Sequence, residues 1–348
     1  MIKSLNKYLL LIILILSCSS GGNSPTDPGD DNGGGDNTNP YELPNAVDYG
    51  LSNQVEIVTW NVRNFPQDPN SSVDYVKALL EKWNADIYLL QEVSGSNQKR
   101  DQLISMINSM ADYSYVLDEE SGNLGYAILF KSDYITYIST NELWHDTPNS
   151  ISDCVNNDYL NCIQYQFASR PPMESYLSWT DGTKSINFYT INVHYKASGD
   201  GIYRPNVLDN EATRRHHASL LLSDYIINNR TSDNVFLAGD FNNVGTQDIT
   251  NPALSPFTDV DNFNSASSFK LTDLNFLLGP ESGWSWQGWG SSYDESHFDH
   301  IIINQPLFSY DATSSIDVIN LPNQVEISTN NIRNKISDHQ PVIYRFYP

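Results

Sequence analysis

Hydrophobic residues in this chain are concentrated in short runs that predict buried β-strands. The runs are rich in β-branched and aromatic side chains, and several are apolar at nearly every position, which is typical of strands covered on both faces. They are VEIVTW (55–60), ADIYLL (85–90), YAILF (126–130), INFYTINV (186–193), VFLAG (235–239), HIIIN (300–304) and PVIYRF (341–346).

Apolar residues between these runs recur at helical spacing. Ser72 is placed to cap the first predicted helix, and the third predicted helix runs from about Glu211 to Asn228. The three apolar stripes are Val73, Val76, Leu80 and Trp83; Leu103, Ile104, Ile107 and Met110; and Leu221, Leu222, Tyr225 and Ile226. Strands and helices mixed in this way predict a layered α/β fold. The long loops 140–170 and 244–295 are where functional residues are expected.

The N-terminus has the pattern of an export signal. Lys3 and Lys7 precede an uninterrupted apolar run over 9–16, which is much shorter than the ~20 residues of a membrane-spanning helix. The run ends in ILSC (15–18), which resembles a bacterial lipoprotein cleavage box whose cysteine becomes the acylated first residue. We therefore predict a signal peptide over residues 1–17 and lipidation of Cys18. An ordinary signal peptide is the alternative.

Residues 18–45 consist mostly of Gly, Asn, Asp, Pro and Ser, which predicts a flexible tether. A tether behind a lipidated cysteine would attach the remaining domain, residues 46–348, to a membrane of the bacterial cell envelope. The domain would then be exported and face the periplasm or the exterior. It has no visible internal repeat, and we expect it to be a monomer.

The composition fits a packed domain with an unusual charge. Hydrophobic residues make up 39% of the 348 residues and aromatic residues 12%, which is enough for a large core. The formal net charge of −23 at pH 7 argues against broad electrostatic attachment to nucleic acid or anionic lipid. A local cationic patch or a bound metal can still reverse the sign inside a cleft.

Three cysteines are present, and lipidation of Cys18 would leave Cys154 and Cys162 as a pair. The two lie close together in a polar segment, DCVNNDYLNC, of a chain that we predict to be exported, so a disulfide is favoured. A metal site is the alternative, but the segment offers no further sulfur or histidine ligand.

Polar residues that could ligate a metal, bind a phosphate or act as acids and bases lie at the ends of the predicted strands. They are Asn61, Arg63, Gln91, Glu92, His194, Asp240, Asn242, Asp299, His300, Asp338 and His339. Each alone has a structural explanation, such as a turn residue, a helix-start charge or a satisfied core histidine. Together they place acids, carboxamides and histidines against apolar strands, whose ends converge on one edge when the strands align in a sheet.

This inventory suits the hydrolysis of a phosphoester. Mg²⁺ and Ca²⁺ prefer oxygen ligands, and the acids and carboxamides can supply them. A histidine whose tautomer is fixed by a carboxylate can act as an acid or a base. The sequence contains no H-E-x-x-H, G-x-S-x-G or G-x-x-x-x-G-K-[ST] motif, which argues against the familiar zinc enzymes, serine hydrolases and P-loop proteins.

Six ordered blocks resemble the endonuclease/exonuclease/phosphatase superfamily, and within it the DNase I branch. They are TWNVRNFP (59–66), ADIYLLQEV (85–93), INVHYKAS (191–198), LAGDFNN (237–243), FDHIIIN (298–304) and SDHQPV (337–342). SRPP (169–172), behind the Cys154–Cys162 segment, also resembles the DNase I region with a small disulfide loop and a phosphate-side arginine. The resemblance implies a four-layer α/β/β/α sandwich of two packed mixed β-sheets flanked by helices.

The resemblance also implies a metal site. Glu92 would be the principal ligand of a divalent cation, with Asn61 and Asp338 close by. Mg²⁺ is the expected ion, with Mn²⁺ and Ca²⁺ as alternatives, and a second ion remains open.

The same resemblance implies catalytic roles. His339, oriented by Asp299, and His194 would form the general acid/base pair. Asp240 and Asn242 would orient the attacking water, contact the scissile phosphate or bind a second metal. Arg170 would contact the phosphate.

The chain departs from the DNase I pattern in two places. The glutamate expected to partner the first histidine is missing, because Leu124 or Gly125 occupies its position. His194 therefore either lacks that partner or receives Glu119 or Glu120 from a shifted loop. The basic residue expected after Q-E-V is also replaced by Ser94-Gly95. These changes weaken the case for duplex DNA while leaving the chemistry intact.

Three functions follow as hypotheses. The leading one is a surface-tethered, metal-dependent nuclease that hydrolyses DNA or RNA. Basic residues would form a positive track for the nucleic acid: Arg63, Arg170, Lys196, Arg204, Arg214 and Arg215. Within this track, Arg63 and Lys196 would join Arg170 at the substrate phosphate. The second is a phospholipid- or sphingomyelin-type phosphodiesterase, or another phosphatase, because the tryptophans of GWSWQGWG (283–290) could lie at a lipid interface. Those tryptophans could equally pack under a loop. The third is a non-catalytic surface binding protein.

Overall fold

The computed structural model describes residues 41, 43, 45–119, 124–258 and 268–348. The chain divides into two units, 1–39 and 40–348, and the architecture below is that of the second unit. The predicted signal peptide 1–17, Cys18 and nearly all of the tether 18–45 lie outside the described residues, so these predictions stay predictions. Among the residues that are described, no helix is both long and apolar enough to cross a bilayer.

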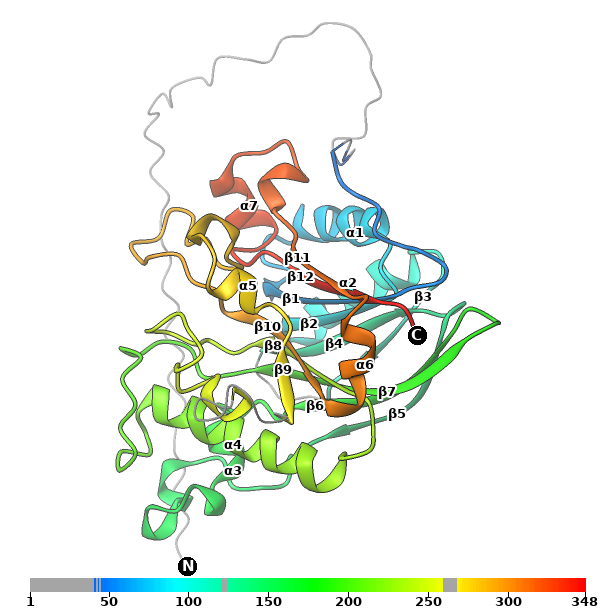
Figure 1. Ribbon diagram of the computed structural model, residues 1–348. Helices are drawn as coiled ribbons and strands as arrows, with labels where there is room; N and C mark the ends of the chain where they lie inside the picture. Colours follow the sequence, from blue (N-terminus) through cyan, green and yellow to red (C-terminus); the bar gives the residue numbers. More distant parts are fainter. Residues whose placement is uncertain (1–40, 42, 44, 120–123, 259–267) are drawn as a thin grey trace, which may run out of the picture. The chain divides into compact units, whose positions relative to one another are not determined.

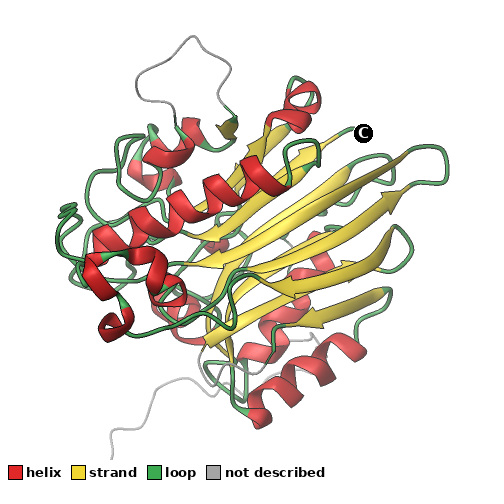
Figure 2. Ribbon diagram, turned by 90° about the horizontal axis from the view of Figure 1, so that it is seen from below, coloured by secondary structure: helices red, strands yellow, loops and turns green. Residues whose placement is uncertain are grey.

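The fold is built on two six-stranded mixed sheets (Figures 1 and 2). The first sheet has the order β11-β12-β1-β2-β4-β3 and the second the order β5-β6-β7-β8-β10-β9. The strands of the first sheet are β1 Val55–Phe65, β2 Ile87–Ser94, β3 Tyr113–Leu117, β4 Leu124–Lys131, β11 Ser315–Val318 and β12 Val342–Phe346. Those of the second are β5 Ile135–Glu142, β6 Met173–Thr180, β7 Ser185–His194, β8 Val235–Asp240, β9 Phe269–Leu271 and β10 Asp299–Asn304.

Helices cover the outer faces of both sheets. The described helices are α1 Ser72–Trp83, α2 Asn97–Asn108, α3 Ile163–Gln166, α4 Glu211–Asn229, α5 Leu274–Leu277, α6 Phe308–Asp311 and α7 Thr329–Lys335. α1, α2 and α7 contribute to one apolar cluster with the first sheet, and α4 contributes to another with the second sheet. The predicted four-layer α/β/β/α sandwich is therefore confirmed.

The nearly continuous apolar runs are explained by strands that are buried on both faces. In β1, Val55 and Ile57 point into the core between the two sheets, whereas Val58, Trp60 and Val62 point into the core beneath the helices. Alternate residues of one strand therefore belong to different cores, as the period of two of a strand requires.

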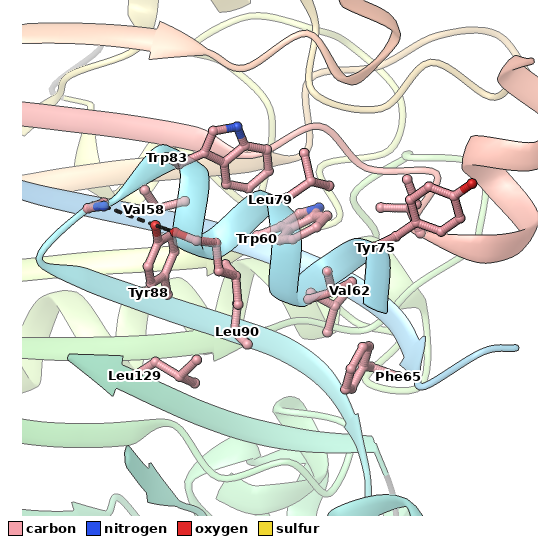
Figure 3. Packing of buried hydrophobic residues seen from close by; sticks show 14 of the residues in the cluster. Val58, Trp60, Val62, Phe65, Tyr75, Leu79, Trp83, Tyr88, Leu90 and Leu129 are labelled. Carbon is pink, nitrogen blue, oxygen red and sulfur yellow. Dashed lines mark hydrogen bonds between the residues drawn. The ribbon is translucent and has the colours of Figure 1, made fainter. Parts of the chain in front are cut away.

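The core under α1 is aromatic (Figure 3). Trp60 of β1 and Trp83 of α1 meet edge to face with ring centroids 5.3 Å apart. Tyr88 of β2 is also fully buried, and its hydroxyl donates a hydrogen bond to the carbonyl of Leu80 and accepts one from the backbone N–H of Ala85 (2.7 and 3.0 Å). These contacts fix α1 against β1 and β2, the two strands that carry site residues from the first sheet.

Some local predictions are corrected. The residue that precedes α1 is Ser71, not Ser72; Ser72 is the first helical residue, and its hydroxyl accepts a hydrogen bond from the backbone of Asp68. β3, β5, β6, β9 and β11 were not expected from the apolar runs. β5 is exposed at most positions and therefore lacks a continuous apolar run.

Cys154 and Cys162 form a disulfide in a segment of three short 3-10 helices, with a Cα–Cα distance of 5.0 Å. The cross-link closes a short loop and packs against Leu208, which lies ahead of α4.

Candidate active site

Three neighbouring strands of the second sheet place acid and histidine side chains in one row. β7 pairs in parallel with β8, with His194 opposite Asp240. β8 pairs antiparallel with β10, with Asp240 opposite Asp299. All three side chains are almost completely buried. Because residues that are opposite one another in a sheet share a face, the register brings these three distant positions together.

The first sheet adds Asn61 and Glu92. Asn61 lies on β1 opposite Gln91 of β2, and the register shifts between Gln91 and Val93. Glu92 lies at this irregularity with a φ of 60°, a left-handed conformation that a non-glycine residue rarely adopts. Irregularities of this kind redirect a side chain and are common beside functional sites.

Asn61 joins the two sheets. Its side-chain amide donates one hydrogen bond to Oε1 of Glu92 (3.1 Å) and one to Oδ2 of Asp240 (2.9 Å). Its carbonyl oxygen accepts a hydrogen bond from the backbone N–H of Arg63. Asn61 therefore holds the two carboxylates near each other through its side-chain NH₂ group. A metal ligand at this position would instead direct its side-chain oxygen towards the cation.

The loop before β12 supplies His339. Trp60 donates its indole N–H to the carbonyl of His339 (3.0 Å), and Ser337 donates its hydroxyl to the carbonyl of Asn61 (2.6 Å). The hydroxyl of Ser337 also accepts a hydrogen bond from the backbone N–H of His339 (3.0 Å). These bonds attach the loop to β1, so the position of His339 is set by the same strand that carries Asn61.

His339 is held by a carboxylate on one side and faces another. Its Nδ1 lies 2.7 Å from Oδ2 of Asp299, and its Nε2 lies 3.8 Å from Oδ2 of Asp240. Burial alone would lower the pKa of His339, but the adjacent Asp299 and Asp240 carboxylates outweigh burial and raise the pKa well above the ordinary value. The ring therefore carries a proton at neutral pH.

The pKa values of the other two central groups, Asp240 and His194, are shifted in opposite directions. Burial raises the pKa of the Asp240 carboxyl, although the nearby His339 opposes this shift. Burial, together with the positive charges of Arg170 and His339, lowers the pKa of His194. His194 is therefore neutral, and its Nε2 lies 3.6 Å from Asp240 and 3.8 Å from Glu92.

The missing partner of His194 has a structural explanation. The Nδ1 of His194 is buried and has no hydrogen-bond partner among the described residues. A side chain at Gly125 would meet the carboxylate of Asp118, which accepts the backbone N–H of Tyr126 and pairs with Arg100 at 2.8 Å. Of the two proposed replacements, Glu119 lies 3.7 Å from His145, and Glu120 is outside the described part of the chain.

The predicted cationic track is largely bound to the protein itself. Arg170 donates Nε and Nη2 hydrogen bonds to the carbonyls of His194 and Tyr195 at the site. Arg214 and Arg215 also donate to backbone carbonyls, and Arg204 forms an ion pair with Asp200. Because Arg214 and Arg215 are buried and Arg204 is paired with a carboxylate, few of these residues offer a free positive charge, and the positive track stays a prediction.

Four further predicted residues lie around the central group: Arg63, Asp338, Lys196 and Asn242. Arg63 contacts Asp338 at 3.4 Å and donates to the carbonyl of Arg333, so Asp338 is engaged by a cation in this arrangement. Lys196 donates to the carbonyl of Ala197. Asn242 has a φ of 46°, and its side-chain amide donates to the carbonyl of Tyr195.

A buried network that the sequence did not reveal lies behind the site. Oδ2 of Asp273 lies 2.7 Å from Nε2 of His297 and 2.8 Å from Nδ1 of His300. The other nitrogen of His300 lies 3.1 Å from Oδ1 of Asn243. Both ring nitrogens of His300 thus lie within hydrogen-bond distance of an oxygen atom. The spacing of the two histidines in HFDH was visible in the sequence, but their partner Asp273 is far from them along the chain.

Ser285 connects this network to Asp299, one of the three side chains in the row formed by β7, β8 and β10. Ser285 donates its backbone N–H to Nδ1 of His297 (3.1 Å) and accepts the backbone N–H of Asp299 on its hydroxyl (3.0 Å). Burial alone would raise the pKa of Asp273, but the contacts with His300 and His297 outweigh burial and lower it. The network therefore supports the start of β10, where Asp299 stands.

The central donors suit a divalent cation. Ligand atoms of Asp240, Asp299 and His339 lie within 4.8 Å of one another, and because the ring of His339 is protonated, the carboxylate oxygens are the atoms of this group that a cation can bind. One amide holds Glu92 close to Asp240, so two carboxylates that would otherwise repel each other converge. A hard divalent cation binds such oxygens and relieves their repulsion.

Comparison with known proteins identifies the class. The sequence model of the Endonuclease/Exonuclease/phosphatase family matches residues 58–339. The chain therefore belongs to this family, and the match spans every residue of the central site. No curated protein matches the sequence.

Solved structures share the fold at low sequence identity. D. rerio TDP2 complexed with single strand DNA product has a TM-score of 0.59 and 12% identity, over 85% of this chain and 99% of that chain. An endonuclease/exonuclease/phosphatase family protein from Bacteroides thetaiotaomicron has a TM-score of 0.54 and 17% identity, over 84% of this chain and 94% of that chain. A mannosyl-6-phosphatase of the same species has a TM-score of 0.52 and 15% identity, over 84% of this chain and 100% of that chain.

Proposed function

We propose that the protein is a divalent-metal-dependent hydrolase of phosphoesters. The observation that carries this proposal is the 2.7 Å contact between His339 and Asp299, with the free edge of the same ring directed towards Asp240. Asn61 joins Asp240 to Glu92 across the two sheets. The arrangement combines a proton donor, a carboxylate of raised pKa and a carboxylate that can hold a cation, within a few ångströms of one another.

Each of these side chains would have a distinct role in the hydrolysis of the phosphoester. His339, kept protonated by Asp299, donates a proton to the leaving oxygen as the P–O bond breaks. Asp240 is suited to orient the attacking water and accept its proton, because its pKa is raised. His194, beside Asp240, and Arg170 would offer hydrogen bonds to the phosphate oxygens. A divalent cation held by Glu92 would neutralise phosphate charge.

Within this class, we propose a nucleic acid as the leading substrate, cleaved as DNA or RNA. Support comes from the DNase I-like motif order and from the zebrafish relative, which was crystallised with a single strand DNA product. The arginines around the site are mostly bound to the protein's own oxygens. Nucleic-acid hydrolysis should therefore depend less on salt than that of an enzyme that releases many counterions.

A lipid phosphodiester is the second candidate. Trp284 donates its indole N–H to the carbonyl of Phe276, and Trp289 packs against the core beneath α1 and α7. Trp284 and Trp286 also line a cavity beside Asn242. Packing therefore accounts for much of the tryptophan-rich loop, while Trp284 and Trp286 also border the cavity that a substrate could enter.

A substrate panel tests the proposed function. Purified residues 46–348 should hydrolyse at least one of plasmid DNA, RNA, sphingomyelin vesicles and p-nitrophenyl phosphate with Mg²⁺, Mn²⁺ or Ca²⁺. EDTA should abolish turnover, because the carboxylate cluster needs a cation to accept phosphate. Cleavage of nucleic acid alone would favour the nuclease, and cleavage of the vesicles alone the lipid enzyme. No turnover with any ion would contradict the proposal and favour a binding protein.

A further inference from the structure

Two arginines beside the candidate active site share one carboxylate. Nε of Arg63 lies 3.4 Å from Oδ2 of Asp338, and Nε of Arg333, in the last turn of α7, lies 3.9 Å from the same oxygen. The guanidinium of Arg63 also donates a hydrogen bond to the carbonyl of Arg333. About a quarter of each arginine side chain is exposed, 26% and 25%. One positive charge of the pair is therefore left uncompensated, in a chain whose formal net charge is −23.

The pair is attached to the segments that carry the catalytic groups. Asp338 directly precedes His339 in the chain. The backbone N–H of Arg63 donates a hydrogen bond to Oδ1 of Asn61 (2.9 Å). Within the described residues, no contact joins either guanidinium group to Asp240. The two arginines therefore stand at the edge of the catalytic row and not within it.

The backbone directs Arg63 to this place. Arg63 and Asn64 have φ values of 47° and 49°, so two consecutive non-glycine residues adopt the left-handed conformation. The backbone N–H of Asn64 donates to Oε2 of Glu92 (2.8 Å), and Nζ of Lys99 donates to the carbonyl of Asn64 (3.1 Å). Such conformations persist only where the surroundings fix them, and they are found most often at functional sites. The turn that positions Arg63 is thus fixed to the proposed metal ligand.

Both guanidinium groups retain N–H donors for a ligand. Arg333 donates Nη1 to the carbonyl of Trp289 (3.1 Å), and its buried Nε has no hydrogen-bond partner among the described residues. No described oxygen accepts a hydrogen bond from Nη2 of Arg63 or of Arg333. Arg170, in contrast, directs both Nε and Nη2 to backbone carbonyls. Free guanidinium donors of this kind match the oxygens of a phosphate.

We propose that Arg63 and Arg333 together bind a phosphate that neighbours the scissile phosphate in a nucleic acid strand. This inference rests on the proposed nuclease function and adds a second phosphate site to it. It moves Arg63 from the scissile phosphate to the neighbouring one, and it gives a role to Arg333, which none of the sequence blocks contains. Asp338 orients both guanidinium groups before the substrate binds, which lowers the entropy cost of ordering them.

Arg333→Gln distinguishes a strand from an isolated phosphoester. The variant should lower kcat/KM for a single-stranded octanucleotide of deoxythymidine or uridine by about tenfold, the factor expected from the loss of one charged hydrogen bond. It should leave kcat/KM for bis(p-nitrophenyl) phosphate within about twofold of the wild type, because this ester has no second phosphate. A purely structural role of Arg333 would displace the loop of His339 and slow both substrates to the same extent.

Arg345→Gln is the matched control. Arg345 is an arginine of similar exposure, 21%, and it pairs with Asp317. It lies opposite Glu56, near the start of β1 and away from Asn61. The control should leave kcat/KM for both substrates within about twofold of the wild type, with circular dichroism to verify the folding of both variants.

Salt dependence provides an independent measurement. For single strands, each phosphate contact contributes about 0.7 to the slope of log affinity against log salt concentration. The slope of log kcat/KM for the octanucleotide should therefore be shallower by about 0.7 in Arg333→Gln and unchanged in Arg345→Gln. A wild-type slope in Arg333→Gln would overturn the inference.

The outcomes separate this inference from the proposed hydrolase. Equal losses for the octanucleotide and the isolated ester in Arg333→Gln would overturn the inference and leave the hydrolase intact. A wild type that hydrolyses the isolated ester or sphingomyelin but neither octanucleotide would do the same. A wild type that hydrolyses no phosphoester with any ion would overturn the hydrolase and, with it, the assignment of the two arginines to a substrate.

Discussion

Replacing His339 by Gln lowers kcat for the best substrate of the panel by about 10³-fold, within the range that a general acid contributes. The physical reason is the loss of the proton that Asp299 keeps on the ring, at a contact of 2.7 Å. Glutamine retains a polar side chain of similar length but cannot donate a proton of comparable acidity. The measurement is steady-state hydrolysis at saturating metal, with circular dichroism to verify folding.

His145→Gln is the matched control for this variant. His145 is an exposed histidine whose only described carboxylate contacts are with Glu119 and Glu142, at 3.7 and 3.8 Å, outside the site. Its replacement should leave kcat within about twofold of the wild type, as expected for a surface substitution. A His339→Gln enzyme that keeps more than a tenth of the wild-type kcat would contradict the role of His339.

Replacing Asp273 by Ala should lower the free energy of unfolding by about 3 kcal/mol, because two buried imidazoles each lose a hydrogen-bond partner at a cost of roughly 1–3 kcal/mol. Asp273 is fully buried and is the only described carboxylate in contact with His297 and His300. Its loss leaves two buried imidazoles without their shared acceptor. Urea unfolding at pH 7 measures the change.

The pH dependence of this variant carries additional information. The folded-state pKa of Asp273 lies below the ordinary value, so its stabilisation is fully present above about pH 4 and is lost as the pH falls further. Asp273→Asn should therefore flatten the acid limb of the stability profile. Asp294→Ala, an exposed change without a described partner, should alter stability by less than about 0.5 kcal/mol. Equal losses in the two alanine variants would contradict the assigned network.

Much of the fold was predictable because apolar runs mark strands that are buried on both faces. The runs at 235–239 and 300–304 correspond to β8 and β10. β5 was missed because most of its side chains face solvent. A strand that buries little leaves almost no apolar signal in the sequence.

The site was predictable to the extent that it depends on strand ends. His194, Asp240 and Asp299 end or begin consecutive strands of one sheet, so their register brings them together. The engagement of arginines by carbonyls depends on tertiary geometry, and a count of basic residues cannot reveal it. The same holds for Asp273, whose partners His297 and His300 lie more than twenty positions along the chain.

The most direct test of the central claim is a Mg²⁺ titration of phosphoester hydrolysis by the wild type and by Glu92→Gln. If a cation bound beside Asp240 sustains the reaction, the amide variant should need at least tenfold more Mg²⁺ for half-maximal rate, because a charged oxygen ligand is lost. Identical Mg²⁺ curves for the two proteins would contradict the account.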